Sequence, residues 1–254
     1  MATNQTILQL TKVSKTYTSR GNYLPVIRDI SLHVNKGEFV SLLGPSGSGK
    51  STLFRIISGL VKAEEGKVSI DGQEVLGNYI SIVGYMPQKD LLLPWRTLIQ
   101  NAALPLLVQK VSQKEAYLKV RELLPVFGLE EFENVFPKQL SGGMRQRAAL
   151  LRTVLIDSNL MLLDEPFAAL DALTREKLQE WLMGVLQLFN KSVLFITHSI
   201  DEAIYLSDRI YVISHRPGEI VLELKVEIQR PRDRKIVTTK EFINYKEELL
   251  EALR

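Results

Sequence analysis

Two glycine-rich segments of this chain carry the residue types that bind phosphate. The first, Gly44-Pro45-Ser46-Gly47-Ser48-Gly49-Lys50-Ser51, follows an apolar run at residues 39–43 and precedes a helical pattern from Thr52. Glycines tolerate the backbone angles that let consecutive N–H groups surround an anion, and the helix aims the positive end of its dipole at it. Lys50 would bridge the β- and γ-phosphates of a nucleotide, and the Ser51 hydroxyl would bind Mg²⁺. An ordinary glycine turn is the alternative interpretation.

The second segment is Leu140-Ser141-Gly142-Gly143-Met144, at the head of a helix predicted over residues 144–156. Ser141 is suited to cap that helix, and Gly142 and Gly143 expose the N–H groups of its first turn, so this helix end is an anion site. Because the chain has one glycine loop but two phosphate-facing surfaces, we hypothesise that a neighbouring copy completes each site. A plain capped helix would explain the Ser-Gly-Gly sequence by itself.

Two adjacent carboxylates follow a further apolar run. Residues 160–163 are predicted to form a buried strand, and Asp164 and Glu165 come at its carboxyl end, where open α/β sheets bind their ligands. Asp164 would hold Mg²⁺ through its water shell, while Glu165 would accept the proton of an attacking water. The alternative is that Asp164-Glu165-Pro166 only begins a helix.

A histidine closes the next apolar strand. His198 follows residues 192–197 and should project into the same crevice, because ligands bind at the carboxyl ends of parallel strands. There it would hydrogen-bond the γ-phosphate or the attacking water. His33 and His215 have no such placement, and we expect no role for either.

The composition limits the remaining possibilities. The 254 residues, 45% of them hydrophobic and 24% charged, suit one large globular unit. The net charge is +3, and because the basic residues are interspersed with 29 acids, nucleic acid is not an expected partner. The absence of cysteine excludes disulfides and cysteine-bound zinc. We expect no signal peptide in residues 1–10 and see no apolar run near the ~18 residues that span a bilayer, so any membrane role would act through another protein.

The order of predicted elements indicates a parallel sheet covered on both faces. Strands are expected at residues 7–13, 26–34, 68–70 and 80–86, with turns at residues 18–22 and 71–72. Residues 98–136 have helical spacing and no convincing strand, which suggests a helical insertion. From residue 160, strands (160–163 and 193–197) alternate with helices (174–189 and 201–206). The chain then continues with a strand-like stretch over residues 220–228 and a helix from about residue 239.

Taken together, the motifs resemble the ATP-binding subunit of an ATP-binding cassette (ABC) transporter. The resemblance covers residues 7–218, and the motifs come in the family's order with 23 residues from Ser141 to Asp164 and 33 from Glu165 to His198. It implies an α/β P-loop NTPase core, with a RecA-like, mostly parallel sheet and an N-terminal antiparallel β part, plus an α-helical subdomain. The expected organisation is a single domain, residues 1–254, in which residues 1–88 and 157–220 form the nucleotide-binding core, residues 89–156 the helical signature subdomain and residues 221–254 a C-terminal extension.

The resemblance also assigns roles to residues. Tyr17 would stack on adenine, Gln88 would sense Mg²⁺ and the membrane subunit, Asp171 matches the D-loop aspartate, and Ser141 would contact the γ-phosphate bound by the opposite subunit. The signature ends in Met144, where Gln is common, and the D-loop begins with Ala168, where Ser is common; neither change removes a phosphate ligand. The resemblance implies ATP with Mg²⁺ as the substrate. The expected catalytic residues are Glu165, His198, Lys50 and Gln88, and the expected metal ligands are Ser51, Gln88 and Asp164. The expected nucleotide ligands are Tyr17, residues 44–52, Ser141, Gly142, Gly143 and Asp171.

A finer resemblance concerns the segment Asp90-Leu91-Leu92-Leu93-Pro94-Trp95-Arg96 and the later Arg230-Pro231-Arg232. Both are similar to the subgroup that drives uptake of nitrate, sulfonates, taurine and similar small solutes. The leucines and Trp95 could form the groove that receives a coupling helix of the membrane subunit, or they could be a buried helix start. The implied partners are a second copy or a homologous ATPase subunit, a membrane permease and a solute-binding protein, at the cytoplasmic face of the cell membrane.

An alternative function is a cassette that drives a cell-envelope complex mechanically or regulates it without transporting anything. The sequence separates the two functions only through the segment at residues 90–96. Relatives in DNA repair or chromosome organisation carry a long coiled coil or cysteine-bound zinc, which this sequence lacks. The transported solute cannot be predicted from this chain, because other polypeptides select it.

Overall fold

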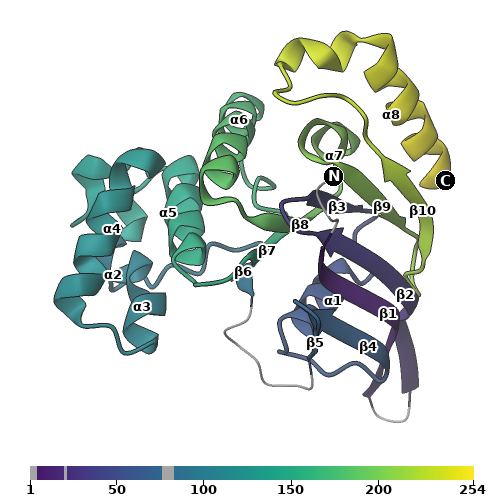
Figure 1. Cartoon of the computed structure of the whole chain (residues 1–254), viewed down its shortest axis with the longest axis horizontal. Helices are drawn as coiled ribbons and strands as arrows, with labels where there is room; N and C mark the ends of the chain where they lie inside the picture. The colour runs from purple at the N-terminus through teal and green to yellow at the C-terminus, as the bar shows by residue number, and fades with distance from the viewer. Residues whose placement is uncertain (1–4, 20–21, 76–82) are drawn as a thin grey trace. The chain divides into compact units, whose positions relative to one another are not determined.

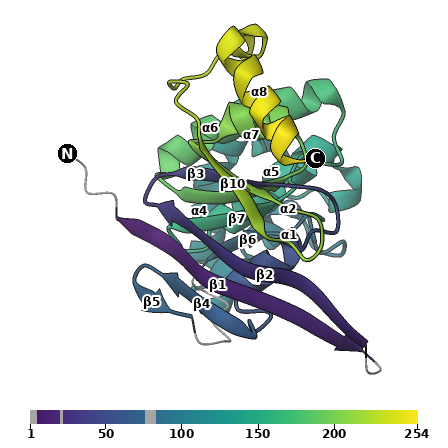
Figure 2. The same cartoon turned by 90° about the vertical axis from the view of Figure 1, so that its right-hand side faces the viewer.

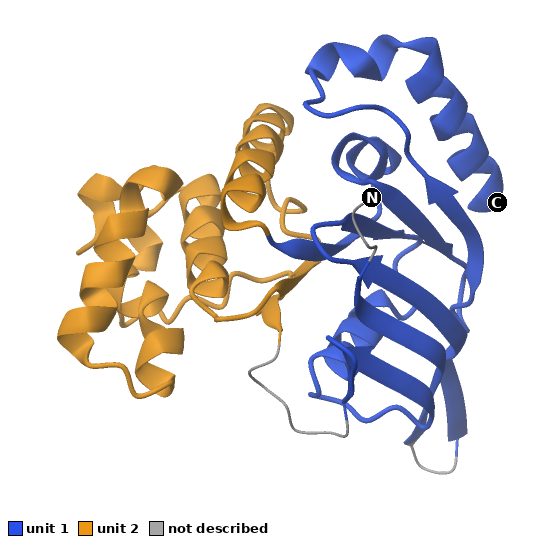
Figure 3. Cartoon of the chain, in the orientation of Figure 1, with its two compact units in different colours: residues 1–82, 191–254 blue, residues 83–190 orange. Residues whose placement is uncertain are grey.

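The structure is a computed structural model that describes residues 5–19, 22–75 and 83–254. Internal contacts divide the chain into two units, residues 1–82 with 191–254 (unit 1) and residues 83–190 (unit 2), which Figure 3 colours separately. The division expected from the sequence is by function, into a nucleotide-binding core, a helical subdomain and a C-terminal extension. The two units are defined by internal contacts, so they do not test that division, which stays a prediction.

Unit 1 begins with an antiparallel sheet in the order β2-β1-β4-β5. Its strands are β1 (Thr6–Ser19), β2 (Asn22–Asn35), β4 (Glu65–Ile70) and β5 (Gln73–Glu74). Figure 2 shows β1 and β2 side by side along their length. Asp71 and Gly72 have φ of 49° and 79°, the backbone of the tight turn predicted between β4 and β5. The turn predicted at residues 18–22 was too long, because residues 18, 19 and 22 pair as strands; residues 20–21 lie outside the described part.

Unit 1 also contains a mixed sheet whose central strands are parallel. Strand β3 (Phe39–Leu43) lies between β8 (Ser192–Thr197) and β9 (Arg209–Ile213), parallel to both, and β10 (Ile220–Lys225) pairs antiparallel with β9. Every residue of β3, β8 and β9 is buried, which explains their continuous apolar sequences. Figures 1 and 2 draw α7 (Ile200–Leu206) and α8 (Lys240–Ala252) above this sheet and α1 (Lys50–Ile57) below it. The predicted coverage of both faces is therefore confirmed for this part of the sheet.

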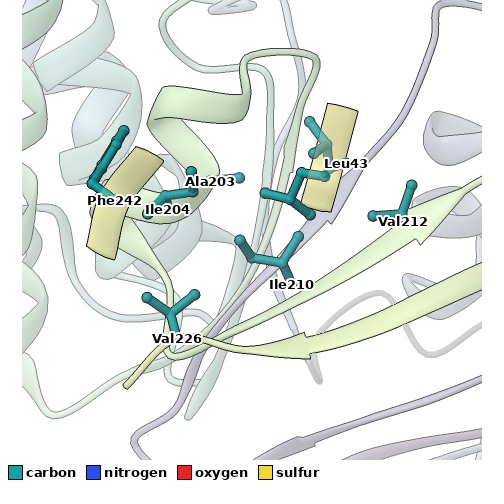
Figure 4. Close-up of a cluster of buried hydrophobic side chains, with 8 residues drawn as sticks. Leu43, Ala203, Ile204, Ile210, Val212, Val226 and Phe242 are labelled. Carbon is teal, nitrogen blue, oxygen red and sulfur yellow. The ribbon is translucent and has the colours of Figure 1, made fainter. Parts of the chain in front are cut away.

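The C-terminal segment belongs to the core of unit 1. Phe242 and Leu249 of α8 are buried together with Ile204 of α7 and Val226, in a cluster that also reaches Leu43 (Figure 4). The strand predicted over residues 220–228 ends earlier, at Lys225, and a short 3₁₀ turn, η3 (Arg234–Thr238), precedes α8. Thr239 caps α8 by accepting a hydrogen bond from the Phe242 N–H, as expected for a helix that starts there.

Unit 2 is mainly helical. Its two strands, β6 (Gly84–Met86) and β7 (Leu160–Asp164), are parallel, and its helices are α2 (Leu98–Ala102), α3 (Leu104–Val108), α4 (Gln113–Phe127), α5 (Gly142–Val154) and α6 (Ala172–Phe189), with 3₁₀ turns η1 (Glu130–Phe132) and η2 (Pro137–Gln139). The helical insertion predicted over residues 98–136 is confirmed. Of the strand predicted at residues 80–86, residues 80–82 lie outside the described residues. Helix α5 ends at Val154, two residues before the predicted end.

Candidate active site

The glycine loop lies between a buried strand and a short helix, as predicted. It starts directly after β3, and α1 begins at Lys50, two residues earlier than expected. Gly47 and Gly49 have φ of 81° and 101°, which L side chains rarely adopt, and Gly49 is the N-cap of α1. A Cβ on Gly49 would lie 2.5 Å from a methyl carbon of Ile27, so both its backbone angle and its packing require glycine. The loop therefore has the backbone that an anion nest needs.

Lys50 is folded back over this loop. Its side chain is 5% exposed, and Nζ donates to the carbonyl oxygens of Gly44 at 2.8 Å and Pro45 at 2.7 Å. Next to it, the hydroxyl of Ser48 is buried and has no hydrogen-bond partner among the described residues. A buried hydroxyl without a partner is costly unless a ligand or water satisfies it. A phosphate oxygen in the loop would remove that cost, so the loop fits the phosphates of ATP.

His198 lies at the same sheet edge as the glycine loop. In the parallel pairing of β3 with β8, Leu43 is opposite Thr197, so the residues that follow them, Gly44 and His198, leave adjacent strands at the same level. His198 is exposed, whereas all of β8 before it is buried. The Thr197 hydroxyl accepts from the Ser199 N–H at 3.0 Å and donates to Glu202 at 2.6 Å, which fixes the chain after His198.

The two carboxylates and the Q-loop glutamine meet in unit 2. Met86 of β6 pairs with Leu163 of β7, so Gln88 and Glu165 follow adjacent parallel strands at one edge. Gln88 Nε2 donates to Glu165 Oε2 at 3.4 Å, and Asp164, the last residue of β7, is 4% exposed. The alternative that Asp164-Glu165-Pro166 begins a helix is wrong, because the next helix, α6, starts at Ala172.

Glu165 has an unusual backbone conformation. Its φ is 45°, in the left-handed region that few residues other than glycine adopt. Such conformations cost of order 1–3 kcal/mol and concentrate where function requires a fixed side-chain direction. The Ala168 N–H donates to the Glu165 carbonyl oxygen at 3.1 Å and closes the turn that holds this conformation. The half-buried carboxylate is therefore aimed by the backbone as well as by Gln88.

The head of the signature helix packs against the D-loop side of α6. Ser141 caps α5, with its Oγ accepting from the Met144 N–H at 3.3 Å. A Cβ on Gly142 would lie 3.3 Å from Leu170, and one on Gly143 would lie 3.2 Å from the methyl group of Thr174, so a side chain at either position would require its neighbour to shift. The first intrahelical bond runs from the Arg145 N–H to Ser141, which leaves the amides of the first turn, those of the glycines included, without helical partners.

Asp171 caps α6. Its Oδ1 accepts from the Thr174 N–H at 3.0 Å, and hydrogen bonds from Thr174 lower the pKa of the Asp171 carboxyl below its usual value. The D-loop aspartate therefore has a structural task in this chain as well as the role implied by the resemblance.

Tyr17, the expected adenine-stacking residue, lies near the end of β1 and pairs with Leu24 of β2. Its ring is 37% exposed, and Lys15 Nζ lies 5.3 Å from the ring centroid. A partly exposed ring can offer a stacking face. Its role stays a prediction.

Magnesium fits the oxygen donors at these strand ends. Mg²⁺ takes one or two carboxylates together with phosphate oxygens and water, so a cluster of several carboxylates is not required. No group of three or more His, Cys, Asp or Glu suited to a metal is found within the described residues. Ser51 follows the glycine loop, whereas Asp164 and Gln88 belong to unit 2, and the three keep their predicted roles.

Sequence reasoning missed several residues that build the site. Arg145 and Arg152 of α5 bond to Asp90 and Leu91, and the fully buried Asn101 makes four hydrogen bonds to residues 93–97. Arg216 bonds to the glycine loop. The Pro217-Gly218 pair that follows Arg216 is typical of a turn, and it was the available signal for this arginine.

Known proteins share sequence and fold with this chain. The family model described as ABC transporter matches residues 27–168. The chain is 43% identical to an uncharacterized ABC transporter ATP-binding protein of Methanocaldococcus jannaschii, over 97% of this chain and 91% of the relative. It is 38% identical to the nitrate import ATP-binding protein NrtD of Synechocystis, over 97% and 95%. Its fold is similar to a dimeric ATP-binding cassette bound to ADP and Pi, with a TM-score of 0.77 and 34% identity over 87% of this chain and 99% of that one.

Proposed function

Because this chain belongs to the ABC transporter family and is an ATPase that uses ATP with Mg²⁺, we propose that it powers uptake of a small solute through a membrane permease. The solute class we propose is a small anion such as nitrate, a sulfonate or taurine, or a similar molecule. A relative that is similar over nearly its whole length is named a nitrate import protein, which supports this class. No helix in the described part of the chain is long and apolar enough to cross a membrane.

The observation that carries the catalytic part of the proposal is the pairing of Gln88 with Glu165. Two side chains that follow adjacent parallel strands are joined by a hydrogen bond, and one of them has a strained backbone. In the proposed reaction Glu165 accepts the proton of the attacking water, and Gln88 holds the carboxylate in direction. Geometry of this kind suits in-line attack at a γ-phosphate.

The remaining groups stabilise charge on the phosphates. Lys50 exchanges the carbonyl oxygens of Gly44 and Pro45 for phosphate oxygens when a nucleotide binds, and the loop N–H groups surround the same phosphates. His198, at the same sheet edge, donates to the γ-phosphate or orients the water. Ser51, Gln88 and Asp164 would hold the Mg²⁺ that binds with ATP, and the ion would supply positive charge that offsets the charge of the phosphates.

Two copies of the chain complete the site in this proposal. The N-terminal end of α5, capped by Ser141, is partly exposed. The backbone N–H groups of its first turn are suited to bind an anion, which in this proposal is a phosphate held by the other copy. ATP bound by the glycine loop of one copy would therefore meet Ser141 of the other. The solved cassette similar to this chain is a dimer, which supports this arrangement.

The permease contact is proposed at the loop of residues 90–97. Leu91 and Trp95 are 57% and 70% exposed, which contradicts the alternative that both are buried at a helix start, whereas Leu92 is buried. The side chain of Asn101 fixes this loop by two hydrogen bonds: it accepts from the Leu93 N–H at 2.7 Å and donates to the carbonyl oxygen of Arg96 at 3.0 Å. A rigid loop that presents an apolar anchor costs little conformational entropy when a partner binds it.

The test of transport is uptake in the cell that makes this protein. Deleting the gene is expected to abolish uptake of one labelled small anion among nitrate, taurine and an alkanesulfonate. The wild-type gene should restore uptake, and a gene encoding Glu165→Gln should not. If uptake of all candidate solutes survives the deletion while the purified chain hydrolyses ATP, the transport function is wrong and the ATPase activity stands.

A further inference from the structure

The turn between β9 and β10, residues 214–219, lies directly against the glycine loop. A Cβ on Gly218 would lie 2.2 Å from the carbonyl oxygen of Ser48, which is closer than any side chain could be. Just before the turn, Ile213 of β9 is so close to Gly44 that a Cβ there would lie 2.4 Å from it. The glycine loop therefore lies against the turn at Gly218 and against the end of β9 at Ile213.

The turn is itself held in place. The Gly218 N–H donates to Val26 of β2 at 2.9 Å, and the Gly218 carbonyl oxygen accepts from the Arg28 N–H at 3.0 Å. Inside the turn, the Ser214 hydroxyl accepts from the Glu219 N–H at 3.0 Å and donates to the carbonyl oxygen of His215. A turn that is bonded to β2 and within itself is a firm support for whatever it contacts.

Arg216 extends this contact to the middle of the glycine loop. Its Nε and Nη2 both donate to the carbonyl oxygen of Gly47 at 3.2 Å. A trans peptide directs its C=O and the following N–H in opposite directions. Because the carbonyl groups of Gly47 and Ser48 both face the turn, the N–H groups of Ser48 and Gly49 must face away from it.

We infer that Arg216 is a positioning residue for phosphate binding, acting through the Gly47–Ser48 peptide. Glycine peptides rotate easily, and Gly47 has a φ of 81°. Within the loop, the Ser48 N–H donates to the Pro45 carbonyl oxygen, but at 3.4 Å this hydrogen bond is long and restrains the peptide weakly. The guanidinium bonds the carbonyl side of the peptide, so the Ser48 N–H stays on the opposite side, where an anion would replace Pro45 as its acceptor. This inference rests on the proposed role of the glycine loop as the nucleotide site.

The test compares Arg216→Ala with Arg28→Ala in the full chain. Arg28 is a matched control, because its Nη1 donates to Glu219 of the same turn at 3.1 Å but does not bond to the glycine loop. Arg216→Ala is expected to raise the KM for MgATP and the Kd for MgADP about 5- to 10-fold, with kcat changed less than about 3-fold. Arg28→Ala should change all three less than about 2-fold. A purely structural role would lower the fraction of folded enzyme, and so kcat and Tm, and would leave KM alone.

Two further variants separate hydrogen bonding from charge. Arg216→Lys keeps the charge without the fork, and Arg216→Gln keeps a neutral N–H donor. We expect neither to restore the wild-type KM and Gln to be no worse than Lys. An unchanged KM in Arg216→Ala would overturn the inference, and so would full restoration by Lys with none by Gln.

Lys50→Ala separates this inference from the function on which it rests. If Lys50→Ala leaves the Kd for MgADP unchanged, the glycine loop is not the nucleotide site and the proposed function fails first. If Lys50→Ala loses nucleotide binding while Arg216→Ala does not, only the role of Arg216 fails.

Discussion

The guanidinium of Arg152, near the end of the signature helix α5, donates from Nη1 to the carbonyl oxygen of Leu91 at 2.8 Å. Nη2 of the same group bonds to the carbonyl oxygen of Asp90, and Arg145, one turn after Ser141, forms an ion pair with the Asp90 carboxylate at 3.2 Å. The helix that begins at Ser141 is thus bonded along its length to the loop proposed to meet the permease. Movement of one should displace the other.

Arg152→Ala is expected to weaken this link and to cost about 1–2 kcal/mol of stability, because two carbonyl oxygens lose a charged donor. Burial lowers the pKa of the Arg152 guanidinium from its usual value, opposed by the Asp90 carboxylate, so this group is partly desolvated and not a surface charge. Urea unfolding measures the loss. Arg121→Ala breaks an exposed arginine-glutamate pair in the same unit and should have a smaller effect. Equal effects would mean that the link to Leu91 is no stronger than a surface ion pair.

Glu165→Gln should reduce the rate of phosphate release about 10²- to 10⁴-fold, since the amide cannot accept the proton of the attacking water. Nucleotide binding should persist, and MgATP should hold the variant as a dimer in size-exclusion chromatography. Glu251→Gln, an exposed carboxylate on α8, is the control and should keep wild-type activity. A Glu165→Gln chain that hydrolyses ATP at the normal rate, or that stays monomeric with MgATP, would contradict the proposed site.

Comparing Ser141→Ala with Ser112→Ala distinguishes the helix-capping role of Ser141 from its proposed role in ATP hydrolysis. Ser141 caps α5 and Ser112 caps α4, and each Oγ accepts a backbone N–H three residues on at 3.3 Å. Either serine-to-alanine change should cost about 1 kcal/mol through the lost cap. Only Ser141→Ala should also lower ATP turnover, by about 10- to 100-fold, because a γ-phosphate donor is lost. Similar turnover in the two variants, at matched folded fractions, would remove Ser141 from the site.

The elements that the sequence predicts well are those with a local signal. Strands β3, β7 and β8 are buried along their whole length, so they appear in the sequence as mainly apolar runs. Gly44, the Asp164-Glu165 pair and His198 mark where these strands end. The ends of β1 and β2 were predicted poorly, because exposed polar residues such as Thr18 pair in a hairpin as well as apolar ones do. The polar residues at the ends of β1 and β2 indicate that these positions face solvent, but they do not indicate where the hydrogen-bonded pairing of the two strands stops.

The parts of the site that the sequence does not reveal depend on contacts between distant residues. Arg216 is 169 positions from Gly47, and Arg152 is 61 from Leu91, so no periodicity records either bond. Both arginines resemble solvated surface charges in the sequence. Asn101 sits inside a helix, where a buried polar side chain is unexpected until the loop carbonyl groups around it are known.

Asp171→Asn should change the dependence of stability on pH. The pKa of Asp171 is lowered by Thr174 from its usual 3.8, so the stabilisation by its charge is present above pH 3.8 and is lost as the pH falls through the lower, folded value. Asparagine still caps a helix but has no charge for the helix dipole. The wild-type chain should therefore have the higher Tm at pH 6, and the difference should shrink as the pH falls below 3.8. A difference in Tm that is the same at all pH values would show that charge has no part in this cap.

Phe242→Ala should unfold unit 1 more easily, although Phe242 lies in the C-terminal extension. Its ring is 1% exposed and packs with Leu249, Ile204 and Val226, the cluster drawn in Figure 4. Removing a buried aromatic ring costs about 3–5 kcal/mol, so the midpoint of urea unfolding should fall well below that of the wild type.

The neighbouring residue supplies the control for this prediction. Ile243 on the same helix is 44% exposed, and Ile243→Ala should cost less than about 1 kcal/mol. Because α8 contacts α7, the helix that follows His198, loss of the ring should also lower ATP turnover in proportion to the unfolded fraction and leave the KM for MgATP unchanged. If Phe242→Ala is no more destabilising than Ile243→Ala, the extension is a detachable segment and not part of the folded core of the ATPase.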